Sequence, residues 1–68
     1  MVNVNLFKGK MVSSGYNQES LARKMKISAN TLSAKINGKS QFDLDEVLLL
    51  CELLSIDSND EKCQIFLN

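Results

Sequence analysis

Apolar residues recur three and four positions apart along most of this chain, in short segments separated by polar residues and glycine. That spacing places side chains on one face of an α-helix, so the pattern predicts helices and no strand of alternating character. In the first segment, Asn5 is expected to cap a helix that runs to about Ser14 and stops at Gly15. The expected inner side of this helix carries Leu6, Phe7 and Met11.

A second short helix is predicted to begin at Gln18. Asn17 is its expected N-cap, because an asparagine side chain can accept a hydrogen bond from the unpaired backbone donors of a helix start. Leu21, Ala22 and Met25 share one face of this helix, and the small Ala22 leaves room for another helix to cross closely.

A third helix is predicted to follow directly after a tight corner that Ile27 fills from below. Ser28 is its expected N-cap, and Leu32 and Ile36 face inward. Asn37 and Gly38 end it, since glycine adopts the left-handed conformation that commonly closes a helix. The outward flank is expected to comprise Asn30, Thr31, Ser33, Ala34 and Lys35.

Two more helices are predicted in the rest of the chain. Asp43 caps the more apolar one, which carries Leu44, Val47, Leu48, Cys51 and Leu54 at helical spacing. The last helix fits Ser58 to Leu67, where Ser58 and Glu61 have the spacing of a capping box. The whole chain, residues 1–68, is therefore predicted to form a single all-α domain of five helices.

The segment from Asn17 to Gly38 resembles the helix-turn-helix of the phage repressor and Cro family. The residues that carry the resemblance are Gln18, Leu21, Ala22, Ile27, Ser28, Thr31, Leu32 and the Asn37-Gly38 pair. Two positions depart from that family's pattern: Lys26 stands where the corner is often glycine, and Lys35 where a bulky residue is often found. The resemblance implies a compact domain like that of the lambda repressor.

The resemblance also implies a set of DNA contacts. The second helix of the motif enters the major groove in this class, and its candidate base contacts are Ala29, Asn30, Ser33, Ala34 and Lys35. Asn30 is the sharpest candidate, since its amide can pair with adenine, although Asn30 and Ser33 can also be plain solvated residues. Candidate phosphate contacts are Gln18, Thr31, Asn37 and Lys39. Gln18 can equally be a polar helix start, and Asn37 a helix-ending residue.

Net charge is zero, but the two halves of the chain differ strongly. Residues up to Phe42 include seven basic residues and one acidic residue, for a net charge of +6, whereas the remainder has a net charge of −6. A basic half can face phosphates, while a neutral total weakens nonspecific attraction, so tight binding by one copy is not expected. The charges can also merely solvate helix surfaces.

Other classes of protein find little support in the sequence. The chain has no histidine to serve as a general base and no paired nucleophile, so we do not expect an enzyme or a cofactor. Cys51 and Cys63 lack further metal ligands and are expected to be buried free thiols. No apolar run is long enough to span a bilayer, and a cytoplasmic protein with no small-molecule substrate is expected.

The last two helices carry more large apolar residues than one inward stripe requires. The possible dimer surface comprises Leu50, Leu53, Ile65, Phe66 and Leu67, unless the core needs all of them. The function expected is that of a small Cro-like phage or prophage repressor that binds double-stranded operator DNA, with a homodimer on DNA as the candidate assembly. The alternative is a protein-interaction module, an antitoxin or antirepressor that binds through its acidic, leucine-rich half.

Overall fold

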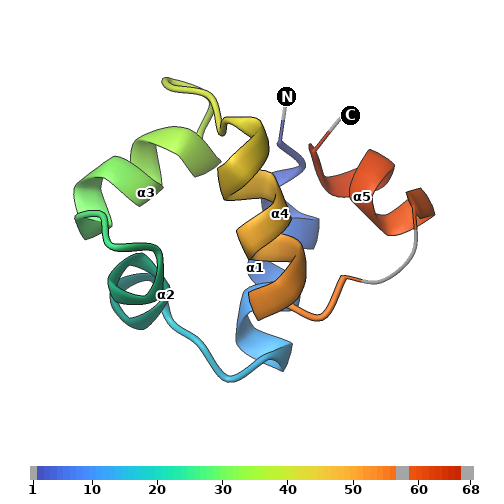
Figure 1. Cartoon of the computed structure of the whole chain (residues 1–68), viewed down its shortest axis with the longest axis horizontal. Coiled ribbons are helices and arrows are strands. Elements are labelled where there is room, and N and C mark those ends of the chain that lie inside the picture. The colour runs from blue at the N-terminus through green and yellow to red at the C-terminus, as the bar shows by residue number, and fades with distance from the viewer. Residues whose placement is uncertain (1, 57–58, 67–68) are drawn as a thin grey trace.

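A computed structural model of the chain describes residues 2–56 and 59–66, and for Asn59, Glu61 and Cys63 it describes the backbone alone. These residues form five α-helices and no strand, which confirms the predicted fold class. The helices are α1 (Val4–Ser13), α2 (Gln18–Met25), α3 (Ala29–Ile36), α4 (Leu44–Leu53) and α5 (Asn59–Phe66). In Figure 1, α2 and α3 lie at one end, α4 crosses in front of α1, and α5 lies at the other end.

Three of the predicted N-caps are confirmed. The Asn17 side chain accepts a hydrogen bond from the Ser20 amide at 2.8 Å, and the Ser20 hydroxyl accepts one from the Asn17 amide at 2.9 Å. Ser28 accepts from the Thr31 amide at 3.0 Å, and Asp43 accepts from the Glu46 amide at 2.8 Å. Each cap satisfies a backbone donor that has no partner within its helix, so it stabilises the helix start by about 1 kcal/mol.

The ends of α1 to α4 all use the same left-handed turn. After α2, for example, the amides of Lys26 and Ile27 donate to the carbonyls of Arg23 and Ala22 at 3.1 and 3.0 Å. Residues with positive φ follow each of these helices: Gly15, Lys26, Gly38 and Ser55, with φ of 84°, 60°, 83° and 56°. Gly15 and Gly38 were predicted to stop their helices, and this is confirmed.

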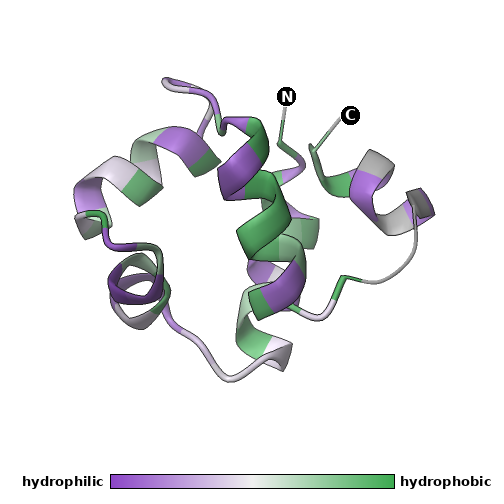
Figure 2. Ribbon diagram, in the orientation of Figure 1, coloured by the Kyte–Doolittle hydropathy of each residue, from purple (hydrophilic) through white to green (hydrophobic). Residues whose placement is uncertain are grey.

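One apolar core joins all five helices. Three phenylalanine rings form one cluster in contact with this core: Phe7 lies 5.9 Å from Phe42 and 6.3 Å from Phe66, and Phe42 lies 6.1 Å from Phe66, measured between ring centroids. Figure 2 shows apolar positions on the inner sides of the helices and along much of α4. The buried residues are Phe7, Met11, Leu21, Ala22, Met25, Leu32, Ile36, Leu50, Cys51, Leu54, Ile56, Ile65 and Phe66.

Two details of the prediction for the first helix are wrong. The cap is Asn3, whose side chain accepts from the Leu6 amide at 3.2 Å, and the helix begins at Val4 instead of after Asn5. Asn3 is selected because its own amide donates to the Ile65 carbonyl of α5 at 2.7 Å. With that register Phe7 points into the core, whereas Leu6 lies on the outer side with 41% of its surface exposed.

The predicted inner face of the fourth helix is only half right. Cys51 and Leu54 are buried and Val47 is partly buried, but Leu44 and Leu48 point outward, with 72% and 52% of their surfaces exposed. Leu50 occupies the core in their place. The helix carries two overlapping stripes of apolar residues at helical spacing, one with Leu44 and Leu48 and the other with Leu50. Packing against the other helices buries the stripe that contains Leu50.

The residues predicted for a dimer surface are therefore mostly unavailable. Leu50, Ile65 and Phe66 are buried in the core and Leu53 is only partly exposed, because a chain this short needs its large apolar residues inside. Leu67 and the proposed Ser58 cap lie outside the described residues, as does the capping-box pairing of Ser58 with Glu61. The exposed apolar residues of α4 are Leu44 and Leu48.

Replacing the corner residue by glycine is expected to stabilise the fold. Lys26→Gly removes the steric cost of a left-handed conformation, about 1–2 kcal/mol, against about 0.5–1 kcal/mol of glycine entropy, so unfolding should require about 0.5–1 kcal/mol more. Chemical denaturation measures this difference. The matched control is Lys24→Gly within α2, which should lower stability by about 1 kcal/mol. A loss of stability in both variants would contradict the left-handed corner.

Candidate nucleic-acid interface

The corner between α2 and α3 is built on close packing of two short helices. Leu21 and Ala22 of α2 are buried with Leu32 and Ile36 of α3, and α2 and α3 contact each other directly. The methyl side chain of Ala22 permits this close approach. Ile27 in the corner packs partly buried against the same core, as its position predicted. The outer side of α3 is held at a fixed angle to α2 as a result.

Gln18 connects the starts of the two helices. Its side-chain amide donates a hydrogen bond to the backbone carbonyl of Ala29 at 3.2 Å. The side-chain nitrogen of Gln18 carries two N–H donors, and this bond uses one of them. Gln18 therefore has a structural role in the corner, which is compatible with the phosphate contact predicted for it.

The first turns of α3 present small and polar side chains to the surface. Asn30 and Thr31 are exposed, and Ala29, Ser33 and Ala34 are partly exposed. The Ser28 hydroxyl donates to the Thr31 hydroxyl at 2.8 Å, so Thr31 takes part in capping α3. Four of the five candidate base contacts thus share one accessible flank with the candidate phosphate contact Thr31, and their contacts with DNA remain predictions.

The end of α3 carries the two other candidate phosphate contacts. The Asn37 side-chain amide donates to the Ser33 carbonyl at 2.9 Å and to the Ser33 hydroxyl at 3.3 Å. Of the two roles left open for Asn37, the structure contains the helix-ending one. Lys39 is exposed in the loop that follows, where its ammonium is accessible to a phosphate.

Lys35, the fifth candidate base contact, makes its contacts within the protein. Its ammonium lies 2.7 and 2.9 Å from the two carboxylate oxygens of Glu46, and 3.3 Å from the Gln41 carbonyl. The charge of Lys35 is thus engaged within the protein, and its contact with a base stays a prediction. Sequence reasoning missed Glu46, although the spacing of Asp43 and Glu46 matches a capping box.

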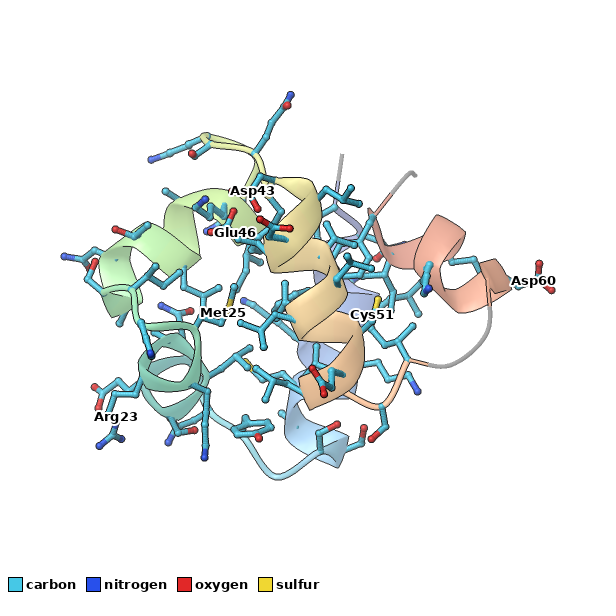
Figure 3. All side chains as sticks on the ribbon, in the orientation of Figure 1. Arg23, Met25, Asp43, Glu46, Cys51 and Asp60 are labelled. Atoms are coloured by element: carbon cyan, nitrogen blue, oxygen red, sulfur yellow. The ribbon has the colours of Figure 1, made fainter. Side chains whose placement is uncertain are left out.

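The charged side chains divide along the molecule as they do along the sequence. Arg23, Lys24 and Lys26 are exposed on α2 and at the corner, while Asp45 and Asp60 are exposed on α4 and α5. In Figure 3, Arg23 and Asp60 lie at opposite edges of the molecule, whose longest extent is 28 Å. On α2 and at the corner, Glu19 is the one exposed acid beside these three cations, so the excess of positive charge there can attract an anionic ligand.

Other kinds of site have less support. Among the described residues, no group of three or more potential ligands could hold a metal ion. Cys51 is a buried free thiol, as expected, and burial raises its pKa while the charge of Lys62 acts in the opposite direction. The Cys63 side chain lies outside the described residues. None of the helices in the described ranges is long and apolar enough to cross a membrane.

Comparison with known proteins agrees with the geometry of the corner. A family model described as helix-turn-helix matches residues 8–60, which include all of α2, α3 and α4. No match was found among curated proteins or among solved structures. The match extends over most of the chain, so this protein belongs to the Cro/XRE-type helix-turn-helix family of DNA-binding transcription regulators.

Proposed function

We propose that this protein is a phage or prophage repressor that occupies an operator by placing α3 in the major groove. The observation that carries the proposal is the two-sided character of α3, in which Leu32 and Ile36 are buried while Asn30 and its neighbours stay accessible. A helix with that orientation can bring its first turns to base edges while α2 crosses the backbone. Occupancy needs no cofactor and no chemical step.

The surroundings of α3 support a DNA-facing surface. The cap at Ser28 orients the start of the helix, and the exposed cations of Arg23, Lys26 and Lys39 lie on either side of it in the chain. Phosphate contacts from such cations position a protein on the duplex, while side chains on the helix read the bases. Sequence preference in this proposal comes mainly from Asn30, with smaller contributions from Ser33, Ala29 and Ala34.

Operator binding by a homodimer is the second part of the proposal. A neutral chain gains little nonspecific attraction, so two linked recognition helices provide affinity that one copy lacks. The exposed Leu44 lines a groove of about 650 Å³, and the exposed Leu48 lies one helical turn further along α4. The groove is lined by Val2, Lys35, Gly38, Ser40, Gln41, Phe42, Asp43, Leu44, Val47, Lys62 and Phe66.

A second copy is the occupant that fits this surface. An interface with twofold symmetry brings each patch against its own counterpart, so a projecting side chain next to an apolar hollow is self-complementary. Leu44 and Leu48 of one copy would enter the groove of the other. Binding of such a pair to one operator requires the two α3 helices to lie about 34–36 Å apart, which is one turn of DNA.

Selection of random duplexes by the purified protein, at two salt concentrations, tests the proposed function. We expect enrichment of a palindrome whose half-sites are about 10 base pairs apart, centre to centre. Placing the enriched palindrome upstream of a reporter gene then distinguishes repression from activation. Recovery of unenriched duplexes at both salt concentrations would contradict operator recognition.

Asn30→Ala is expected to relax base preference at one position of each half-site. Loss of a paired contact with adenine should cost about 1–3 kcal/mol of discrimination against other bases there. Binding of single-substitution duplexes to both proteins measures this change. Asn5→Ala, at an exposed position of α1, is the matched control and should leave the preference unchanged. Equal profiles for all three proteins would remove Asn30 from the interface.

Lys39→Ala is expected to weaken binding to all duplexes by the same factor. Losing one phosphate contact should reduce the slope of log affinity against log salt by about 0.9. Titrations of the enriched duplex and a scrambled duplex at several salt concentrations measure this slope. A slope equal to that of the parent protein would show that Lys39 does not contact a phosphate.

Leu44→Ser combined with Leu48→Ser is expected to abolish pairing while leaving the fold intact, because both side chains are largely exposed. Sedimentation velocity with and without the palindromic duplex measures the assembly state, and affinity for a single half-site should stay the same. Val12→Ser on α1, where the side chain is 70% exposed, is the control. If the double variant still pairs, the interface lies elsewhere. If the parent protein captures a different protein through these leucines and binds no duplex, the interaction-module alternative holds.

A further inference from the structure

Helix α3, the proposed recognition helix, contains one cation, Lys35. Contacts within the protein use all the hydrogen-bonding capacity of its ammonium group. An ammonium group has three N–H donors. The Lys35 ammonium has three acceptors in range: the two Glu46 carboxylate oxygens at 2.7 and 2.9 Å and the Gln41 carbonyl at 3.3 Å. The same ammonium lies 5.9 Å from the centre of the Phe42 ring, within the range of a cation–π contact. A bond from Lys35 to DNA would therefore replace one of these.

Glu46 is itself held in place by the start of α4. Its carboxylate accepts a hydrogen bond from the Asp43 amide at 2.9 Å, while its own amide donates to the Asp43 carboxylate at 2.8 Å. Asp43 is the N-cap of α4 and Glu46 lies in its first turn, where the helix dipole favours negative charge. In Figure 3, Asp43 and Glu46 lie at the start of α4, next to the end of α3. Glu46 cannot turn away from Lys35 without breaking this cap.

The ion pair is partly shielded from solvent. The Lys35 and Glu46 side chains are 14% and 19% exposed. Salt screens such a pair less than it screens exposed charges. The pair should therefore persist over the range of salt in which contacts between exposed lysines and phosphates weaken.

We propose that Glu46 determines the specificity of DNA reading by holding the Lys35 ammonium away from the duplex and by anchoring the end of α3 to α4. Glu46 is thus a positioning residue that acts through Lys35, an inference that rests on the function proposed above. Without a mobile cation, α3 offers DNA only the uncharged side chains of its first turns. A released cation would attract the backbone of any sequence and would add affinity without sequence information.

A cycle of two substitutions tests this role, with the selected operator and a scrambled duplex as the ligands. Glu46→Gln removes the carboxylate charge but keeps a side chain that can complete the cap. Lys35→Gln removes the cation. The slope of log affinity against log salt is measured for the parent, both single variants and the double variant, with Lys39→Ala as the reference for a lost phosphate contact.

In Glu46→Gln the released Lys35 should steepen the salt slope by about 0.9, which is about a 3.5-fold greater loss of affinity between 50 and 200 mM salt. The preference for the operator over the scrambled duplex should fall. Lys35→Gln should keep the parent slope, and the double variant should return to it. A purely structural role for the pair would destabilise the variants without this reversal.

Two other outcomes contradict the proposal. If Lys35→Gln lowers the slope as much as Lys39→Ala does, Lys35 already contacts a phosphate in the complex. If Glu46→Gln binds with the parent slope and preference, Glu46 does not control the cation. If Glu46→Gln does not fold, Lys35→Gln still tests the proposal: the parent slope supports it, and a slope lowered as in Lys39→Ala contradicts it. If the parent protein binds no duplex, the proposed function itself is contradicted. Failure of the Glu46 proposal alone leaves operator binding by the parent protein intact.

Discussion

The packing of α2 against α3 is the contact on which the rest of the molecule depends. Leu21 and Ala22 meet Leu32 and Ile36 there, and all four side chains are buried. A 68-residue chain has room for one core, so the two helices that form the corner also provide a large part of the stability. The left-handed backbone at Lys26 sets the angle of the corner, at a steric cost that glycine would avoid.

The two sides of α3 serve different purposes, and the end of the helix joins them. Its inner side belongs to the core, while Asn30 and the small residues near it stay accessible. At the end of α3, Lys35 and Glu46 connect the helix to α4 through an ion pair that is also part of a helix cap. A single carboxylate thereby stabilises the start of one helix and fixes the position of another.

Local signals in the sequence predicted the helix boundaries well. Asn17, Ser28 and Asp43 cap the helices they were expected to cap, because a capping bond joins residues only three positions apart. Gly15 likewise ends the first helix with a left-handed turn. The first cap was misplaced because Asn3 and Asn5 are equally suitable locally, and a bond from Asn3 to distant α5 selects between them.

The sequence by itself determined that the chain is helical, where most helices begin and end, and which motif α2 and α3 form. These properties follow from residues that lie within a few positions of one another. Only the tertiary structure decided which face of α4 is buried, because Leu48 and Leu50 lie on two overlapping apolar stripes and the packing of the other helices selects the stripe with Leu50. It also decided that Lys35 faces Glu46 instead of solvent, since the two residues are eleven positions apart and meet only when α3 packs beside α4.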